Sequence, residues 1–165
     1  MATAVEVGDK APLFEVRTSD GQDIKLAELV GKKRVVLYFY PRDFTPVCTK
    51  EACGMRDLMA ELQDEETLIL GVSRDDNAEH ERFRSKYSVQ FPLISDPERD
   101  LARRYGAVSG LRNLLGGTDR VTFVIDKKGT IVERVHAELS ATKHVEAVRA
   151  ALTRCKVREA EVAPG

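Results

Sequence analysis

Apolar and polar positions along this chain predict strands and helices in alternation. Runs rich in β-branched and aromatic residues predict buried strands, and apolar residues every three or four positions predict helices. The expected strands are residues 13–17, 23–25, 35–40, 67–73, 91–94, 121–125 and 130–136. One helix is expected after residue 45, and others at about 26–29, 78–87, 98–105 and 140–154. This order favours an α/β layer sandwich with a mixed sheet and an N-terminal β-hairpin.

The apolar run Val35–Tyr40 leads into the part of the chain that carries candidate chemistry. Pro41 ends the strand, and Thr45-Pro46 predicts a helix start, because threonine caps helices well and proline suits the first helical position. Cys48 is then the third helical residue, among the unpaired N–H groups of the first turn. A thiol there whose pKa falls from about 8.5 to about 6 is roughly 90% ionised at pH 7. We therefore predict that Cys48 is a reactive thiolate.

A second cysteine, Cys53, lies five residues after Cys48. In a regular helix this offset gives a rise of about 7.5 Å and a rotation of about 140°, so the Cα atoms lie roughly 8.7 Å apart. A disulfide requires a Cα separation below about 7 Å. A bond between the two sulfurs would therefore require the first turns of the helix to unwind, and spacing alone does not show that they do.

Three segments carry a resemblance to a known family. Pro41, Thr45 and Cys48 form a P-x-x-x-T-x-x-C motif within YPRDFTPVCTKEACGMRD. The segments VGDKAPLFEV, near the N-terminus, and DRVTFVIDKKG, from Asp119, fit the patterns G-x-x-A-P-x-F and R-x-T-F-x-I-D-x-x-G. On these motifs the chain resembles the peroxiredoxins, in particular their PrxQ or bacterioferritin comigratory protein branch. The resemblance spans most of residues 7–150 and implies a thioredoxin-like fold, with a mixed central β-sheet flanked by helices.

The resemblance also implies roles for five residues. Cys48 would be the peroxidatic cysteine, which peroxide oxidises to a sulfenic acid. Thr45 would hydrogen-bond the bound peroxide, Pro41 would shield the site, and Arg120 would hold the thiolate and polarise the peroxide oxygens. Cys53 would be the resolving cysteine, which condenses with the sulfenic acid to give an intramolecular disulfide.

A few further positions bear on the same comparison. Glu51 falls where the branch has the acid of its T-x-E pattern. Val47 stands where the branch usually has glycine, and this β-branched valine would stiffen the first helical turn. Arg112 is a second candidate for a cation near the site. It lies in an irregular segment whose leucines would either pack in the core or cover the site: Leu111, Leu114 and Leu115.

The activity that the resemblance implies is thiol-dependent peroxidase, in antioxidant defence and redox homeostasis. The substrates would be hydrogen peroxide and organic hydroperoxides, the reductant thioredoxin or glutaredoxin, and the reaction would need no cofactor, metal or flavin. A thiol–disulfide exchange protein is an alternative, although the spacing is C-x4-C rather than C-x2-C. A metal site at the cysteine pair would need two more soft ligands. A non-enzymatic redox sensor would use the same pair only to report oxidation.

Composition narrows the remaining possibilities. The 165 residues favour a single domain, 1–165, with a flexible polar tail from about residue 156. A net charge of −1 gives no electrostatic reason to expect a nucleic-acid or membrane partner. The N-terminus lacks the basic and long apolar regions of a signal peptide, and three cysteines favour a reducing compartment, so we expect a cytoplasmic protein. An intramolecular disulfide would make a monomer sufficient, with a weak dimer still open.

The other titratable and thiol side chains receive structural interpretations. We expect His80 to be a solvated helix residue, His144 to lie on a surface turn of the last helix, and His136 to be structural. Cys155 follows that helix and has no nearby thiol in sequence, so we interpret it as a bystander.

Overall fold

The computed structural model describes residues 5–109 and 116–162. Arg112 and the leucines at 111, 114 and 115 lie outside the described residues, so their predicted roles stay predictions. The helices are α1 (Leu26–Leu29), α2 (Pro46–Leu62), α3 (Asn77–Tyr87), α4 (Asp100–Arg104) and α6 (Ala141–Val162). The strands are β1 (Glu15–Arg17), β2 (Asp23–Lys25), β3 (Arg34–Phe39), β4 (Thr67–Ser73), β5 (Leu93–Ser95), β6 (Val121–Ile125) and β7 (Ile131–His136).

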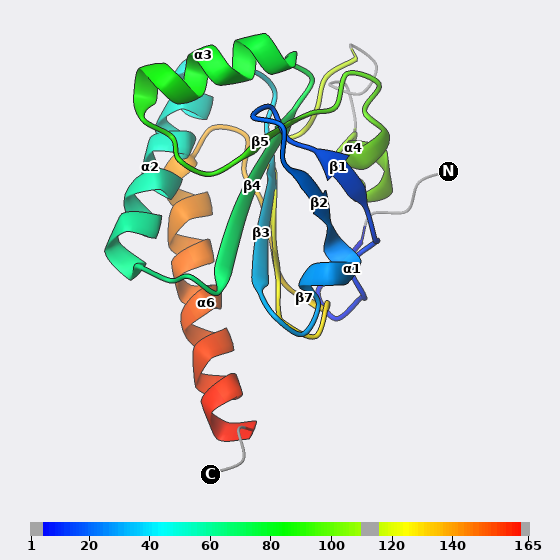
Figure 1. Cartoon of the computed structure of the whole chain (residues 1–165), viewed down its shortest axis with the longest axis vertical. Helices are drawn as coiled ribbons and strands as arrows, with labels where there is room; N and C mark the ends of the chain where they lie inside the picture. The colour runs from blue at the N-terminus through cyan, green and yellow to red at the C-terminus, as the bar shows by residue number, and fades with distance from the viewer. Residues whose placement is uncertain (1–4, 110–115, 163–165) are drawn as a thin grey trace.

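A five-stranded mixed sheet forms the centre of the domain, in the order β5-β4-β3-β6-β7 (Figure 1). β3, β4 and β5 run parallel, whereas β6 pairs antiparallel with both β3 and β7. The separate hairpin of β1 and β2 pairs antiparallel near the N-terminus. The register opposes Phe39 to Val121, and so brings the end of β3 beside the start of β6. This pairing places Arg120 at the same edge of the sheet as the loop after β3.

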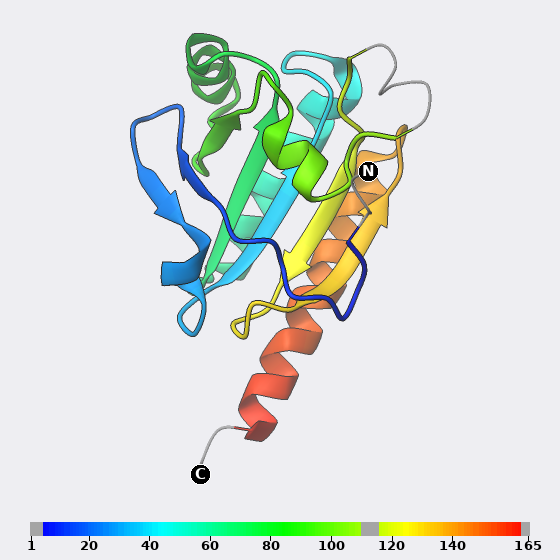
Figure 2. The same cartoon turned by 90° about the vertical axis from the view of Figure 1, so that its right-hand side faces the viewer.

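Both faces of the sheet are covered, because side chains along β3 alternate between two apolar layers. Val35, Leu37 and Phe39 pack with residues of the N-terminal segment and α4. Val36, Tyr38 and Tyr40 pack with residues of α2, α3 and α6 on the other face. Figures 1 and 2 show α2 and α6 on one side of the sheet, and the β1–β2 hairpin, α1 and α4 on the other. The predicted α/β layer architecture is confirmed.

The last helix is longer than the sequence pattern predicted. α6 continues to Val162, so the predicted helix end at about residue 154 is wrong, and residues 156–162 are helical (Figure 2). Lysine, arginine, glutamate and alanine dominate this stretch and are good helix formers. Tertiary ion pairs also tie it to the domain, since Glu159 contacts the buried Arg34 and Lys156 lies 3.3 Å from Asp64. No helix in the described part of the chain has the length and apolar character to cross a membrane.

Candidate active site

Cys48 lies in the first turn of α2, directly after the loop from β3, as predicted. Thr45 has the extended conformation of an N-cap, Pro46 is the first helical residue, and Cys48 is the third. The Cys48 side chain is only 1% exposed. One detail differs from the prediction, because the Thr45 hydroxyl does not cap the helix and instead donates to the Arg42 carbonyl at 2.8 Å. Pro41 opens the loop and is half-buried.

Arg120 supplies a buried cation at this site. Its Nε donates to the Glu138 carbonyl at 2.9 Å, and its Nη1 donates to Glu51 Oε1 at 3.1 Å. Burial opposes a charged guanidinium, but the charges of Cys48 and Glu51, together with side-chain hydrogen bonds to both, raise the pKa of Arg120. The guanidinium is therefore held between a thiol and a carboxyl group, and can stabilise negative charge that develops on either side.

Glu51 is a fully buried carboxyl group one helical turn after Cys48. Burial raises its pKa from the ordinary value of 4.5 to about 7, although the charge of Arg120 acts in the opposite direction. Its Oε2 lies 3.3 Å from Nδ1 of His144, a ring nitrogen that already contacts the Thr122 hydroxyl at 2.7 Å.

His144 is itself buried, and its partners fix its most favourable tautomer. Nε2 lies 2.9 Å from the Ala137 carbonyl, which only a protonated nitrogen can satisfy, so Nδ1 accepts from Thr122. Burial also lowers the pKa of His144, which favours this neutral form. Glu51 Oε2 then faces a lone pair and lacks a hydrogen-bond partner among the described residues. This arrangement favours a protonated Glu51.

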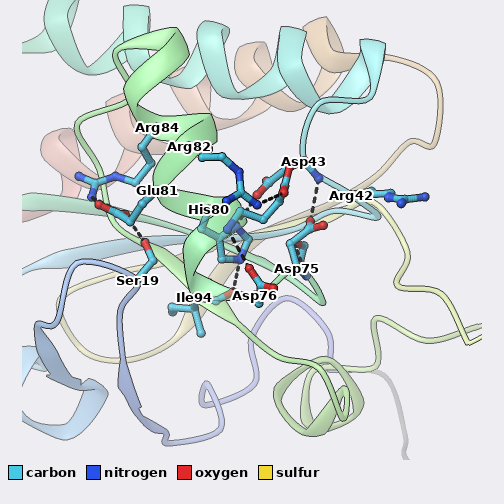
Figure 3. Close-up of polar contacts among 12 residues, drawn as sticks. Ser19, Arg42, Asp43, Asp75, Asp76, His80, Glu81, Arg82, Arg84 and Ile94 are labelled. Atoms are coloured by element: carbon cyan, nitrogen blue, oxygen red, sulfur yellow. Dashed lines mark hydrogen bonds and ion pairs between the residues drawn. The ribbon is translucent and has the colours of Figure 1, made fainter.

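The predictions for two histidines are wrong. His144 is not on the surface, and His80 is not solvated, since both side chains are 0% exposed. His80 contacts Asp43 and the Ile94 carbonyl instead (Figure 3). Helical spacing was the available signal, because His144 precedes Val148 and Leu152 by four and eight positions, on the apolar face of α6. His136 remains at the surface, where its Nε2 lies 2.7 Å from Glu138 Oε2.

The three cysteines occupy different environments, and all three are free. Cys48 is buried and Cys53 half-buried within the same continuous helix α2, so no disulfide joins them in this conformation. Cys155 does not lie beside a fraying tail but is buried in the middle of α6, where burial raises its pKa. Within the described ranges, the side-chain groups spaced to hold a metal ion contain neither Cys48 nor Cys53.

The chain is similar to a known protein family and to curated proteins over most of its length. Residues 7–134 match the model of the AhpC/TSA family. Over 149 residues the chain is 40% identical to a putative peroxiredoxin bcp from Coxiella burnetii, covering 88% of this chain and 97% of that protein. Over 133 residues it is 39% identical to the peroxiredoxin Bcp of Bacillus subtilis, covering 78% of this chain and 83% of that protein.

Solved structures are similar over nearly the whole chain. Peroxidoxin BcpB from Mycobacterium tuberculosis superposes with a TM-score of 0.79 at 33% identity, covering 90% of this chain and 96% of that one. A bacterioferritin comigratory protein from Xanthomonas campestris, described in connection with alkyl peroxide reduction, gives a TM-score of 0.79 at 31% identity. That comparison covers 92% of this chain and 98% of the other.

Proposed function

This chain belongs to the AhpC/TSA family, in its peroxiredoxin Q or Bcp branch, and we propose that it reduces peroxides through Cys48 and Cys53. Membership makes it a peroxidase that acts on peroxides with a thiol reductant. The observation that carries the proposed assignment of residues is the position of Cys48, in the first turn of α2 and beside the buried guanidinium of Arg120.

The first proposed step is attack of the Cys48 thiolate on the terminal oxygen of a hydroperoxide. A sulfur–oxygen bond forms, the O–O bond breaks, and the remaining alkoxide or hydroxide takes up a proton to leave as an alcohol or water. Negative charge moves from sulfur to the leaving oxygen during this step, and we assign Arg120, which lies beside Cys48, to stabilising it on both atoms. Thr45 and Pro41, on the loop just before Cys48, are assigned to holding and shielding the peroxide.

The second proposed step joins Cys48 and Cys53. The Cys53 sulfur attacks the sulfenic acid, a disulfide forms, and water leaves. Because both residues lie in the intact α2 five positions apart, the first turn of the helix must open before the sulfurs meet. A dithiol protein then restores both thiols through a mixed disulfide.

Thioredoxin or glutaredoxin is the proposed reductant, and organic hydroperoxides are among the proposed substrates. The description of the X. campestris relative, which mentions alkyl peroxide reduction, supports the second point. The partly exposed Phe44 beside Thr45 gives the loop an apolar surface suited to an alkyl group. An intramolecular disulfide requires no second subunit, so we propose that the protein acts as a monomer. We also propose that it acts in the cytoplasm.

Peroxide consumption coupled to a thioredoxin system tests the assignment. The wild-type protein should turn over many equivalents of hydrogen peroxide, Cys48→Ser should abolish turnover, and Cys53→Ser should still form the sulfenic acid but no Cys48 disulfide. Turnover retained in Cys48→Ser would remove Cys48 as the nucleophile. A single stoichiometric oxidation of wild type without turnover would instead indicate a redox sensor.

A further inference from the structure

A buried polar cluster, separate from the reacting sulfur, holds the loop between β3 and α2 in place. Asp43, in the middle of this loop, has a fully buried carboxyl group. The Tyr40 hydroxyl donates to its Oδ1 at 2.5 Å, and Nδ1 of His80 lies 2.6 Å from its Oδ2. Figure 3 shows His80 reaching from α3 toward Asp43, and Asp75 reaching the same loop. The backbone N–H of Asp43 donates to Asp75 Oδ2 at 2.8 Å.

Both ring nitrogens of His80 are engaged in hydrogen bonds. Its Nε2 lies 3.1 Å from the Ile94 carbonyl, which accepts but cannot donate. Nδ1 faces the Asp43 carboxyl group, so a proton must lie between these two atoms as well. Neither side chain has a part in the chemistry of Cys48, yet both are buried and hydrogen-bonded. A buried polar pair of this kind fixes the relative position of the two segments that carry it.

Phe44, the next residue of the loop, gives a second indication that α3 holds this conformation. Its φ of 65° lies in the left-handed region, which non-glycine residues rarely adopt. Its ring packs on Phe83 and Tyr87 of α3, with centroids 5.2 and 6.2 Å away. A strained residue persists only where its surroundings determine its position. The loop that leads into Cys48 is therefore held by α3 at two adjacent residues.

We propose that His80 is a positioning residue, which through Asp43 holds the first turn of α2 closed and thereby limits how fast oxidised Cys48 reaches Cys53. The closed turn keeps Cys48 beside Arg120, and the opening that a Cys48–Cys53 disulfide requires must displace the loop held by Asp43. This inference rests on the proposed function, in which Cys53 resolves the sulfenic acid.

We call the contact between His80 and Asp43 the anchor. It has a chemical consequence, because two reactions compete for the sulfenic acid. Attack by Cys53 gives the disulfide and water. Attack on a second hydroperoxide instead transfers one oxygen to sulfur, giving a sulfinic acid and an alcohol or water. A tighter anchor slows the first reaction and leaves more time for the second. Loosening the anchor should therefore lower the yield of sulfinic acid.

Two substitutions of His80 separate its two contacts. The amide nitrogen of asparagine falls near the Nδ1 position of histidine, so His80→Asn keeps a donor for Asp43 and loses the one for Ile94. The amide nitrogen of glutamine falls near Nε2, so His80→Gln keeps the donor for Ile94 and loses the one for Asp43. Both variants carry a side-chain amide. His80→Asn keeps the contact between α3 and the loop at Asp43, and His80→Gln keeps the contact between α3 and β5 at Ile94.

Hydrogen exchange of the reduced protein, without peroxide, measures the opening directly. His80→Gln should speed exchange of the amides from Thr49 to Cys53 by about tenfold, the effect of losing one buried hydrogen bond, whereas His80→Asn should stay within about threefold of wild type. In excess peroxide, the sulfinic acid yield at Cys48 should fall severalfold in His80→Gln and little in His80→Asn.

The outcomes distinguish this inference from the proposed function. If wild type never oxidises Cys48, the proposed function fails, while the exchange experiment still tests the anchor. If both variants exchange alike, or His80→Gln gives more sulfinic acid than wild type, the anchor is overturned. Should His80→Gln fail to fold, Asp43→Asn provides the test, because it replaces the carboxyl group that contacts His80 with an amide of similar volume. Its exchange over the same amides must exceed that of wild type for the inference to stand.

Discussion

The buried carboxyl group of Glu51 makes a quantitative prediction about how stability depends on pH. Its side chain is 0% exposed, and burial raises its pKa from 4.5 to about 7. The folded protein therefore binds this proton more tightly than the unfolded chain does. The contribution to stability is fully present below pH 4.5 and is lost as the pH rises through about 7. Glu51→Gln removes this titration but keeps an oxygen that can accept from Arg120.

The magnitude follows from the size of the pKa change. A rise from 4.5 to about 7 corresponds to about 3 kcal/mol, because each pKa unit is equivalent to about 1.4 kcal/mol. The free energy of unfolding of wild type, relative to that of Glu51→Gln, should therefore fall by about 3 kcal/mol between pH 4.5 and about pH 8.

Urea unfolding of the reduced proteins, at several values across this pH range, measures the difference. The exposed Glu28 on α1 provides the control, and Glu28→Gln should follow the wild-type pH dependence closely. An infrared band of a protonated carboxyl group near neutral pH, absent in Glu51→Gln, would support the same assignment independently. A wild-type minus Glu51→Gln difference that stays constant across the range would refute the reasoning.

Two other substitutions test the cation and the helix contact. Arg120→Ala should lower kcat/KM for hydrogen peroxide by about 100-fold, because the developing oxyanion loses its cation. Arg120→Lys should recover part of this loss. Unchanged kinetics in both variants would show that Arg120 has no part in the reaction. Gly54→Ala should destabilise the protein by about 1–3 kcal/mol in urea unfolding, since an added Cβ would lie 2.7 Å from Val145 Cγ2 where α2 packs on α6. Full wild-type stability of Gly54→Ala would contradict close packing of α2 on α6 at this position.

The sequence predicted those parts of the molecule that local rules determine. The start of α2 was placed correctly, because Thr45 and Pro46 carry conformational preferences that depend little on the rest of the chain. Strands β3 and β6 of the central sheet were recognisable because both are largely apolar runs that are buried along their whole length. These two features together located Cys48.

The sequence did not predict features that depend on partners distant along the chain. The burial of His80 depends on Asp43, 37 positions earlier, and that of His144 on Glu51 and Thr122. Each histidine is a polar residue on the buried face of its helix, and nothing in the local sequence indicates the polar partner that makes this burial possible. The end of α6 was placed too early for a similar reason, because Glu159 pairs with Arg34 across 125 positions.

Disulfide mapping by mass spectrometry after one equivalent of hydrogen peroxide tests most directly whether Cys48 is the nucleophile and Cys53 its partner. The account predicts one dominant product, with a bond between Cys48 and Cys53 and with Cys155 still reduced. A sulfenic acid or disulfide at Cys155, with Cys48 unmodified, would contradict it.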